Sequence, residues 1–376
     1  MANIASPYST YSDTTPQKRI ISDVITMISP YDTPFLDIIG GLDGGSGKFK
    51  FIGKGKMVEW LEDTLTPLSG TFSLAANETV GNVVTLTVAD GNMLQPGHIL
   101  LTANSEMLWV SAVTPSTGVI IVTRAFGTSS ASILTTAAFS VVGMARLEGD
   151  DSDSIGFTDI STNYNYTQIF HKEIKVTETE RVIDNYGFSD AYQYQAAKSM
   201  PEMMRLIELS ILNGYRTAGS ATTPRAMGGY RTFITSNTLS GASMTQATFE
   251  NAIKLIYADG GSGKYTAICS PTNMQKIKNF YDSSSFLRVD RTETTVGMRI
   301  NGIITPFGEV DLVMDRWISD SYIPILDLNN IGMVTLRPFA VEELAKTGDA
   351  MKTELVGEFT LAIKANESHA LLSGVS

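Results

Sequence analysis

The chain has 376 residues, with 28 Lys or Arg against 39 Asp or Glu, so its formal net charge is −11. Such an acidic chain is a poor candidate for a protein that wraps DNA by neutralising phosphates. Its hydrophobic content of 43% supplies material for packed cores and argues against general disorder. At about 150 residues per domain, the length predicts two to three domains.

The cysteine content and the N-terminal residues indicate the cellular compartment in which the protein is made. Cys269 is the only cysteine, so no intrachain disulfide can form. Residues 1–13 lack the basic and apolar regions of a signal peptide, and no apolar run reaches the about 18 residues of a membrane span. We therefore expect a soluble protein without a membrane partner, made and kept in a reducing cytoplasm.

The N-terminal region begins with small polar residues, and residues 1–14 are interpreted as a mobile arm. Thr15 and Pro16 are typical of a helix start, and apolar residues at helical spacing follow them up to about Ser29. A second short apolar segment covers residues 34–39 and ends in two glycines. The chain starts directly at a short arm without a long charged helical leader, so we expect any scaffold to be a separate protein.

Residues 48–60 alternate with period two and predict a strand. Its basic face carries Lys48, Lys50, Lys54 and Lys56. Lysines of this kind either keep an edge strand solvated and free from aggregation, or lie across an acidic neighbouring subunit. Under the second interpretation these lysines and Trp60 make inter-subunit contacts, although tryptophans are in general more typical of packing anchors.

Residues 66–146 differ in composition, with only five charged residues and many Thr and Val. Four candidate strands are separated by turn signals, at residues 82–88, 98–103, 107–113 and 118–123. They predict a small inserted all-β domain without a ligand-binding constellation. Residues 147–160 are acidic, but they lack the glycine and the final glutamate of a calcium loop, so we interpret them as a linker.

A second long strand is predicted at residues 163–177, again from alternation. It is expected to pair with residues 48–60 as a two-stranded ribbon whose tip carries the β insertion. An isolated hairpin is marginally stable in water. The ribbon therefore needs a partner surface, for which another subunit is the natural source.

The C-terminal half combines helices and strands. Residues 188–213 predict the strongest helix, with a kink or restart near residue 200, because Pro201 interrupts the pattern and Ser199 with Glu202 matches a capping box. Residues 225–335 predict a mixed α/β domain. Its helices begin at Thr245 and Ser270, and its strands lie near 265–269, 298–305, 310–314 and 323–328. Residues 354–365 predict a closing strand.

Motifs that carry chemistry are scarce. The segment GGSGK occurs at 44–48 and 260–264, but neither copy has the leading glycine or the hydroxyl residue of a phosphate loop. The three histidines, His98, His171 and His369, lie far apart in the sequence, and Cys269 lies in an apolar strand. Adjacent acidic pairs such as Glu342-Glu343 are expected to be solvated. We predict no catalytic, metal or cofactor site, and we favour a structural or binding role over an enzyme with a dispersed site.

Several local motifs, taken in order, resemble the major capsid protein of tailed bacteriophages, which has the Hong Kong 97-type fold, in a branch with an inserted β module. The motifs lie at residues 33–41, 59–65, 165–169, 176–179, 208–214, 225–229 and 357–361. The resemblance implies an α+β fold. Its parts are an N-terminal arm (1–44), an extended loop (45–65 and 155–178) with the β insertion (66–146), a peripheral domain with a spine helix (179–224 and 336–376) and an axial domain (225–335).

The same resemblance implies a virion protein that self-assembles, as pentamers and hexamers, into an icosahedral or prolate head shell in the host bacterial cytoplasm. It would enclose the double-stranded DNA genome without sequence-specific binding, and separate scaffolding, portal and decoration proteins are expected. Glycines at 40–47 and 227–229 are interpreted as hinges that let one chain occupy both kinds of ring. The alternatives are an encapsulin-like nanocompartment shell and a phage tail or baseplate protein.

Overall fold

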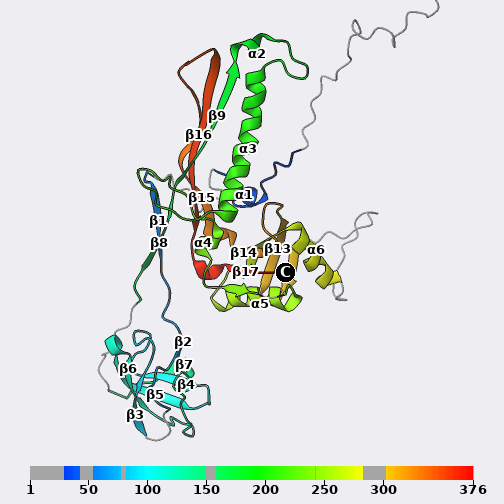
Figure 1. Cartoon of the computed structure of the whole chain (residues 1–376). Helices are drawn as coiled ribbons and strands as arrows, with labels where there is room; N and C mark the ends of the chain where they lie inside the picture. The colour runs from blue at the N-terminus through cyan, green and yellow to red at the C-terminus, as the bar shows by residue number, and fades with distance from the viewer. Residues whose placement is uncertain are drawn as a thin grey trace, which may run out of the picture. The chain divides into compact units, whose positions relative to one another are not determined.

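The computed structural model describes residues 29–42, 54–77, 82–149, 158–241, 243–282 and 302–375 (Figure 1). The chain divides into two compact units. The first consists of Met1–Trp60 and Tyr164–Ser376, and the second is Leu61–Asn163. None of the described helices is long and apolar enough to cross a membrane.

One sheet of the first unit is antiparallel and three-stranded, in the order β15-β16-β9. Its strands are β9 (Gln168–Thr177), β15 (Ile331–Glu343) and β16 (Ala350–Ile363). Helix α3 (Ala191–Asn213) lies along β9 in Figure 1, after the short helix α2 (Glu178–Val182). The alternation in β9 buries Phe170, Ile174 and Val176.

Helix α3 begins after Asp190, whose carboxylate accepts the N–H groups of Tyr192 and Gln193. Of the two alternatives predicted near residue 200, a kink or a restart, the restart is wrong, because α3 continues through Pro201. Ser199 is not a cap: its hydroxyl donates to the carbonyl of Gln195 within the helix. A proline inside a helix costs about 3 kcal/mol, and burial of the apolar stripe beyond it, which includes Met203 and Ile207, offsets this cost.

Another sheet of the first unit is mixed and six-stranded, in the order β10-β17-β14-β11-β13-β12. In chain order its strands are β10 (Thr238–Ser240), β11 (Lys264–Cys269), β12 (Gly302–Thr305), β13 (Gly308–Met314), β14 (Tyr322–Leu326) and β17 (Ala370–Ser373). The predicted strands are confirmed, except that residues 298–301 lie outside the described residues. The closing strand is also confirmed as part of β16.

Helices α5 (Gln246–Ala258) and α6 (Pro271–Asp282) contribute apolar side chains to the core of this sheet. Both predicted starts are confirmed: Thr245 accepts the N–H of Thr248, and Ser270 accepts that of Asn273. The short helices α1 (Pro34–Ile38), α4 (Tyr230–Phe233), η2 (Leu328–Asn330) and η3 (Asn366–Ser368) complete the described helices of this unit. The predicted helix before residue 29 lies outside the described residues.

The second unit contains an antiparallel six-stranded sheet in the order β2-β7-β4-β5-β6-β3. Four strands were predicted and are confirmed: β3 (Val83–Thr87), β4 (His98–Thr102), β5 (Met107–Thr114) and β6 (Val119–Thr123). Two were not predicted: β2 (Ser69–Thr71) is very short, and β7 (Ala138–Met144) has an irregular burial pattern. The turn before β6 contains η1 (Pro115–Thr117).

Candidate assembly elements

A two-stranded ribbon is formed by β1 (Met57–Glu62) and β8 (Ser161–Tyr166). The predicted pairing of these two chain segments is confirmed, but the prediction of one continuous strand over 163–177 is wrong. The strand breaks at Thr167, and β9 pairs with β16 instead of continuing the ribbon. Residues 48–53 lie outside the described residues.

The break at Thr167 is held by buried polar side chains. Asn165 is fully buried; its amide donates to the carbonyls of Gly228 (3.1 Å) and Leu361 (2.7 Å) and accepts the N–H of Gly228 at 2.8 Å. One side chain thus joins β8 to β16 and to the loop before α4. Because buried amides are costly to leave unpaired, this arrangement fixes the point at which β8 gives way to β9.

Glu358 supplies a second anchor beside this break. It is 3% exposed and accepts the hydroxyl of Thr167 at 2.6 Å, and it forms ion pairs with Arg225 and, at 3.2 Å, with Arg337. Burial acts to raise the pKa of Glu358, but the hydroxyl and the two guanidinium groups outweigh it and hold the pKa below its usual range. The ionised carboxylate of Glu358, on β16, therefore connects this strand to Arg337 on β15 and to Thr167 at the break between β8 and β9.

The glycines at 228 and 229 also belong to this joint. A Cβ on Gly229 would lie 2.4 Å from the carbonyl oxygen of Ile211, and the Gly229 N–H donates to the carbonyl of Gly214 at 2.9 Å. Met227 is fully buried and Gly228 is bonded to Asn165. In this conformation the glycines allow close packing of the chain at the base of the ribbon, and the interpretation of 227–229 as a hinge stays a prediction.

The residues predicted to contact other subunits fall into three groups. Lys54 and Lys56 are exposed, as a contact role requires, while Lys48 and Lys50 lie outside the described residues. Trp60 is 5% exposed and packs against Phe233 of its own chain, with ring centroids 5.6 Å apart. This packing agrees with the packing-anchor interpretation of Trp60, and its contact with another subunit stays a prediction.

Large apolar side chains on and near the ribbon, within the second unit, remain in solvent. Leu61, Leu65, Leu68 and Ile160 are 68%, 94%, 68% and 60% exposed. Large apolar residues that stay exposed and follow one another closely along the chain, as Leu61, Leu65 and Leu68 do, are candidates for an interaction surface. Sequence reasoning predicted that the ribbon needs a partner but did not single out these side chains.

The segment around α1 is attached to α3 by a buried carboxyl group. Glu208, fully buried in α3, accepts the N–H groups of Phe35 (2.8 Å) and Leu36 (2.9 Å), and both of these side chains are themselves fully buried. Asp315, also fully buried, follows β13 and lies close enough to share a hydrogen bond with Glu208. Sequence reasoning missed this attachment; the available signal was one glutamate within the apolar stripe of a helix.

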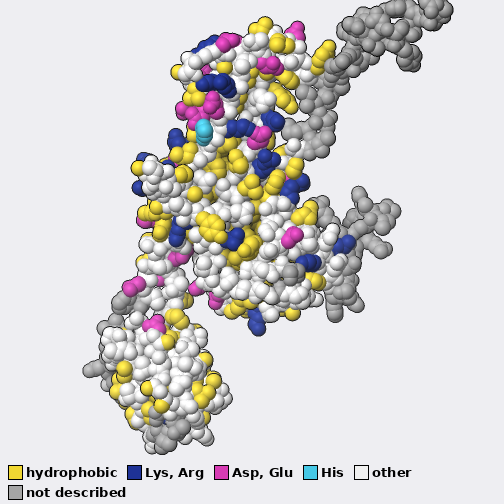
Figure 2. Space-filling model, in the orientation of Figure 1, with side chains coloured by type: hydrophobic (Ala, Val, Ile, Leu, Met, Phe, Trp, Pro, Cys, Tyr) yellow, Lys and Arg dark blue, Asp and Glu magenta, His cyan; other side chains and the backbone are white. Residues whose placement is uncertain are grey.

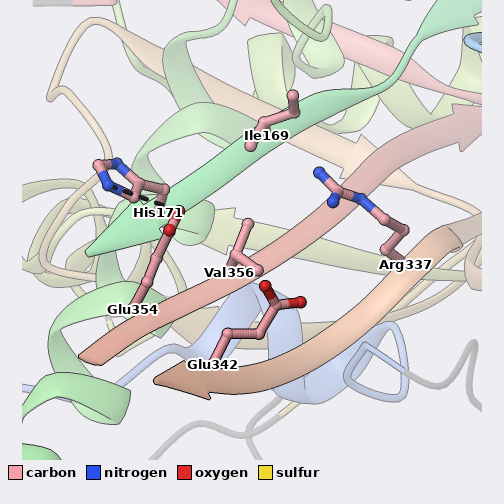
Figure 3. A pocket seen from close by; sticks show the side chains of 6 residues that line it. All are labelled: Ile169, His171, Arg337, Glu342, Glu354 and Val356. Carbon is pink, nitrogen blue, oxygen red and sulfur yellow. Dashed lines mark ion pairs between the residues drawn. The ribbon is translucent and has the colours of Figure 1, made fainter. Parts of the chain in front are cut away.

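An open groove of about 640 Å³ lies on the outer face of the sheet that contains β9, β15 and β16 (Figure 3). Its lining is mixed: Ile169, His171, Arg337, Glu342, Glu354 and Val356. His171 on β9 and Glu354 on β16 form an ion pair at 3.6 Å, and the remaining charged groups, Arg337 and Glu342, both lie on β15 (Figure 3). Such an open arrangement supplies no paired acid and base around an enclosed reacting position.

The other chemically suggestive residues have structural surroundings. Burial raises the pKa of the Cys269 thiol to about 12, so the predicted inert buried thiol is confirmed. Burial lowers the pKa of His369 to about 4, and its ring accepts the N–H of Asp327. The GGSGK copy at 260–264 forms the turn between α5 and β11, with positive φ at Gly260 and Gly263. Within the described ranges, no three acidic, histidine or cysteine side chains cluster to hold a metal.

We next compared the chain with proteins of known structure and with known protein families. Among solved structures, the chain is similar to the cyanophage A-1(L) capsid, with 11% identity, TM-score 0.55, and 98% of this chain and 99% of that chain covered. It is also similar to the capsid of the native GTA particle, with 10% identity, TM-score 0.57, and 99% and 100% covered. An encapsulin complex from Synechococcus elongatus matches at 10% identity and TM-score 0.40, with 58% and 78% covered. At these identities the cyanophage and GTA capsid likenesses establish the fold alone.

A search of curated proteins finds no match. A family model described as SU10 major capsid protein, however, matches residues 8–376, nearly the whole chain. This match and the two full-length capsid likenesses confirm the expected α+β capsid fold and the resemblance read from the sequence. The chain therefore belongs to the SU10 major capsid protein family, and it is a shell protein of a bacteriophage virion capsid.

Proposed function

We propose that copies of this chain assemble as pentamers and hexamers into a closed head shell around double-stranded DNA, each copy laying its ribbon over a neighbour. The shell is icosahedral or prolate. In closed symmetric assemblies the same contact is repeated many times, so modest contacts suffice for a stable container. This assignment refines the capsid role and gives the ribbon a specific task.

The observation that carries the proposal is the exposure of Leu61, Leu65, Leu68 and Ile160 beside a ribbon of only two strands. Burying one such side chain stabilises an interface by about 1.5–3 kcal/mol. A single chain leaves that stabilisation unused. Exposed Lys54 and Lys56 lie just before β1, where they are available to an acidic neighbour; the net charge of −11 makes acidic surface plentiful.

The parts of the chain take the following roles in this proposal. Residues 1–44 are the arm, 45–65 and 155–178 the extended loop, and 66–146 its inserted β domain. Residues 179–224 and 336–376 form the peripheral domain around α3, and residues 225–335 form the axial domain. The separate sheets of the two units support this division.

Partners follow from the same assignment. An acidic inner wall would repel the phosphates of packaged DNA, so the genome could slide during filling without sequence-specific contacts. Separate scaffolding, portal and decoration proteins complete the head. Figure 2 shows that the visible face of the second unit carries few charged side chains, in contrast with the first unit.

The test is the double variant Leu61→Asp plus Leu65→Asp, expressed beside the unchanged chain with and without phage scaffold. Negative-stain electron microscopy should show shells from the unchanged chain and none from the variant, because two charges would enter the proposed interface. Val83→Asp plus Leu134→Asp is the matched control, since these side chains are also exposed in the second unit but lie off the ribbon.

Normal shells from the ribbon variant would contradict the proposal, as would loss of shells from the control variant alone. The nucleic acid content of purified particles separates a genome container from an encapsulin-like compartment. Tubes or trimers instead of shells would favour the tail or baseplate alternative.

A further inference from the structure

Two carboxyl groups meet in the interior of the first unit. Glu208 comes from α3 and Asp315 from the residue after β13, and both are fully buried. Both oxygens of Glu208 accept N–H groups from the first turn of α1, at 2.8 and 2.9 Å. The segment from Phe35 to Leu36 is therefore fastened to α3 through this one side chain.

Asp315 is held from the other side. Its N–H donates to the carbonyl of Cys269 at 2.9 Å, and its Oδ1 accepts the N–H of Trp317 at 2.8 Å. Its buried Oδ2 receives no hydrogen bond from the groups placed in the described part of the chain. Glu208 lies within hydrogen-bond reach of Asp315, so a proton on the Glu208 carboxyl would supply the donor that this oxygen lacks. Without the proton, two carboxylates would face each other away from water, which is costly.

The surrounding charges do not neutralise the pair. Tyr230, at the start of α4, lies near Asp315 and stays un-ionised because burial raises its pKa. Arg316 and Asp32, which lie at the surface beside the buried pair, are about half exposed and form an ion pair with each other at 3.0 Å. Trp317 also bonds to the residues just before α1, because its indole N–H donates to the carbonyl of Asp32 at 2.9 Å.

We propose that Glu208 and Asp315 form a proton-dependent latch that holds α1 against α3 while they share one proton and releases α1 when that proton is lost. Release exchanges a buried pair of carboxylates for solvated ones. The contacts given up are the two N–H bonds to Glu208 and the burial of Phe35, Leu36 and Ile39, while the Trp317 bond to Asp32 can persist at the start of the segment. The device makes attachment of the N-terminal segment dependent on pH, beyond the shell-forming role itself.

The direction of the effect follows from the titration of Glu208. Burial, with the charge of Asp315, raises its pKa to about 8, against the opposing effect of the N–H groups of Phe35 and Leu36. Once α1 leaves, the pKa returns toward its ordinary value. The equilibrium constant for release should then rise up to about tenfold per pH unit between pH 4.5 and pH 8 and level off above.

A spin label on α1 tests the latch in the full chain. Asp37 is exposed in α1, and the only native cysteine, Cys269, is fully buried, so Asp37→Cys gives a single labelling position. The mobile fraction of the label is measured from pH 5 to pH 9, with light scattering in parallel to separate arm release from a change in assembly. We expect the mobile fraction to increase up to about pH 8 and to change little between pH 8 and pH 9.

Two variants of the spin-labelled chain test whether Glu208 and Asp315 cause the pH response. Glu208→Gln removes the titrating group, and Asp315→Asn offers an amide donor to an ionised Glu208; each should flatten the pH response. Glu354→Gln, on the outer face of the sheet, is the control and should retain it. A flat response in the unchanged chain, or a wild-type response in either folded latch variant, would overturn the proposal. If one latch variant fails to fold, the other still decides.

Discussion

The two units differ in where their cores come from. The core of the second unit is drawn from Phe72 to Phe139, a continuous stretch of chain. One core of the first unit instead joins Phe35 to Leu371, with α3 and the last strands between them. Local contacts close short loops and need few distant partners. The comparison teaches that the second unit is built as a self-contained module, whereas the first requires both ends of the chain.

The units also bury charge differently. In the second unit Glu106 and Arg124 form a fully buried pair, and Glu106 also accepts the N–H groups of Ala125 and Ala131. Burial opposes ionisation of Glu106, but Arg124 and these N–H groups outweigh it and lower its pKa. In the first unit the partners of Glu358 are partly in solvent. Matched substitutions therefore sharpen the comparison.

The largest effect is expected for Arg124→Ala. It leaves Glu106 buried without its cation and should destabilise the second unit by about 3–5 kcal/mol. Hydrogen exchange read by mass spectrometry reports both units in one sample. Faster exchange should be confined to residues 61–163, and an equal increase in the first unit would contradict their independence.

Glu358→Ala should have a smaller effect, about 2–3 kcal/mol, because Arg225 and Arg337 retain contact with water. The same exchange measurement should now show faster exchange around β9, β15 and β16 and leave the second unit unchanged. Glu354→Ala, on the same strand but partly exposed, is the control and should change stability by less than about 0.5 kcal/mol.

The pH dependence of stability should also separate the units. Glu208, with its pKa raised to about 8, makes the first unit less stable as pH rises from 4.5 to 8. His369, with its pKa lowered to about 4, makes it less stable as pH falls from 6.5 to 4. The two effects oppose each other between pH 4.5 and 6.5, so stability should be level there and fall by about 2 kcal/mol from pH 6.5 to 8.

Denaturant titrations at several pH values measure this fall. Glu208→Gln should abolish the decrease above pH 6.5 without altering the decrease below pH 4.5. A decrease above pH 6.5 that persists in this variant would show that another group is responsible.

The smallest effect on folding is expected for Lys54→Glu plus Lys56→Glu. Both side chains are exposed, so the free energy of unfolding should change by less than about 0.5 kcal/mol. Assembly should nevertheless be hindered, because four units of charge change beside the ribbon. Shell yield by electron microscopy, compared with Lys254→Glu plus Lys278→Glu on α5 and α6, provides the measurement. Equal yields would remove the electrostatic role given to these lysines.

Local patterns were reliable where the structure is local. Alternation and turn residues predicted four strands of the second unit, and the caps at Thr245 and Ser270 predicted α5 and α6. The short strand β2 was missed because its three residues carry too little pattern for any period to be visible. The ordered capsid motifs predicted the family, which the match over residues 8–376 confirms.

The errors arose where distant residues decide local structure. Nothing near Thr167 in the sequence announces that β9 will leave the ribbon for β16, since Glu358 and Arg225 hold that break. Pro201 and Ser199 indicated a restart, but packing against the sheet keeps α3 continuous. The burial of Trp60 against Phe233 likewise depends on a residue far along the chain.

The sequence by itself determined the acidic charge, the low charge of residues 66–146, the starts of α5 and α6 and the capsid family, because these depend on composition and near neighbours. Only the tertiary structure decided that Glu208 meets Asp315 beneath α1 and that Leu61 and Leu65 stay in solvent. The physical reason is that burial and pairing energies depend on which atoms meet after folding, and those atoms lie more than a hundred residues apart at Glu208.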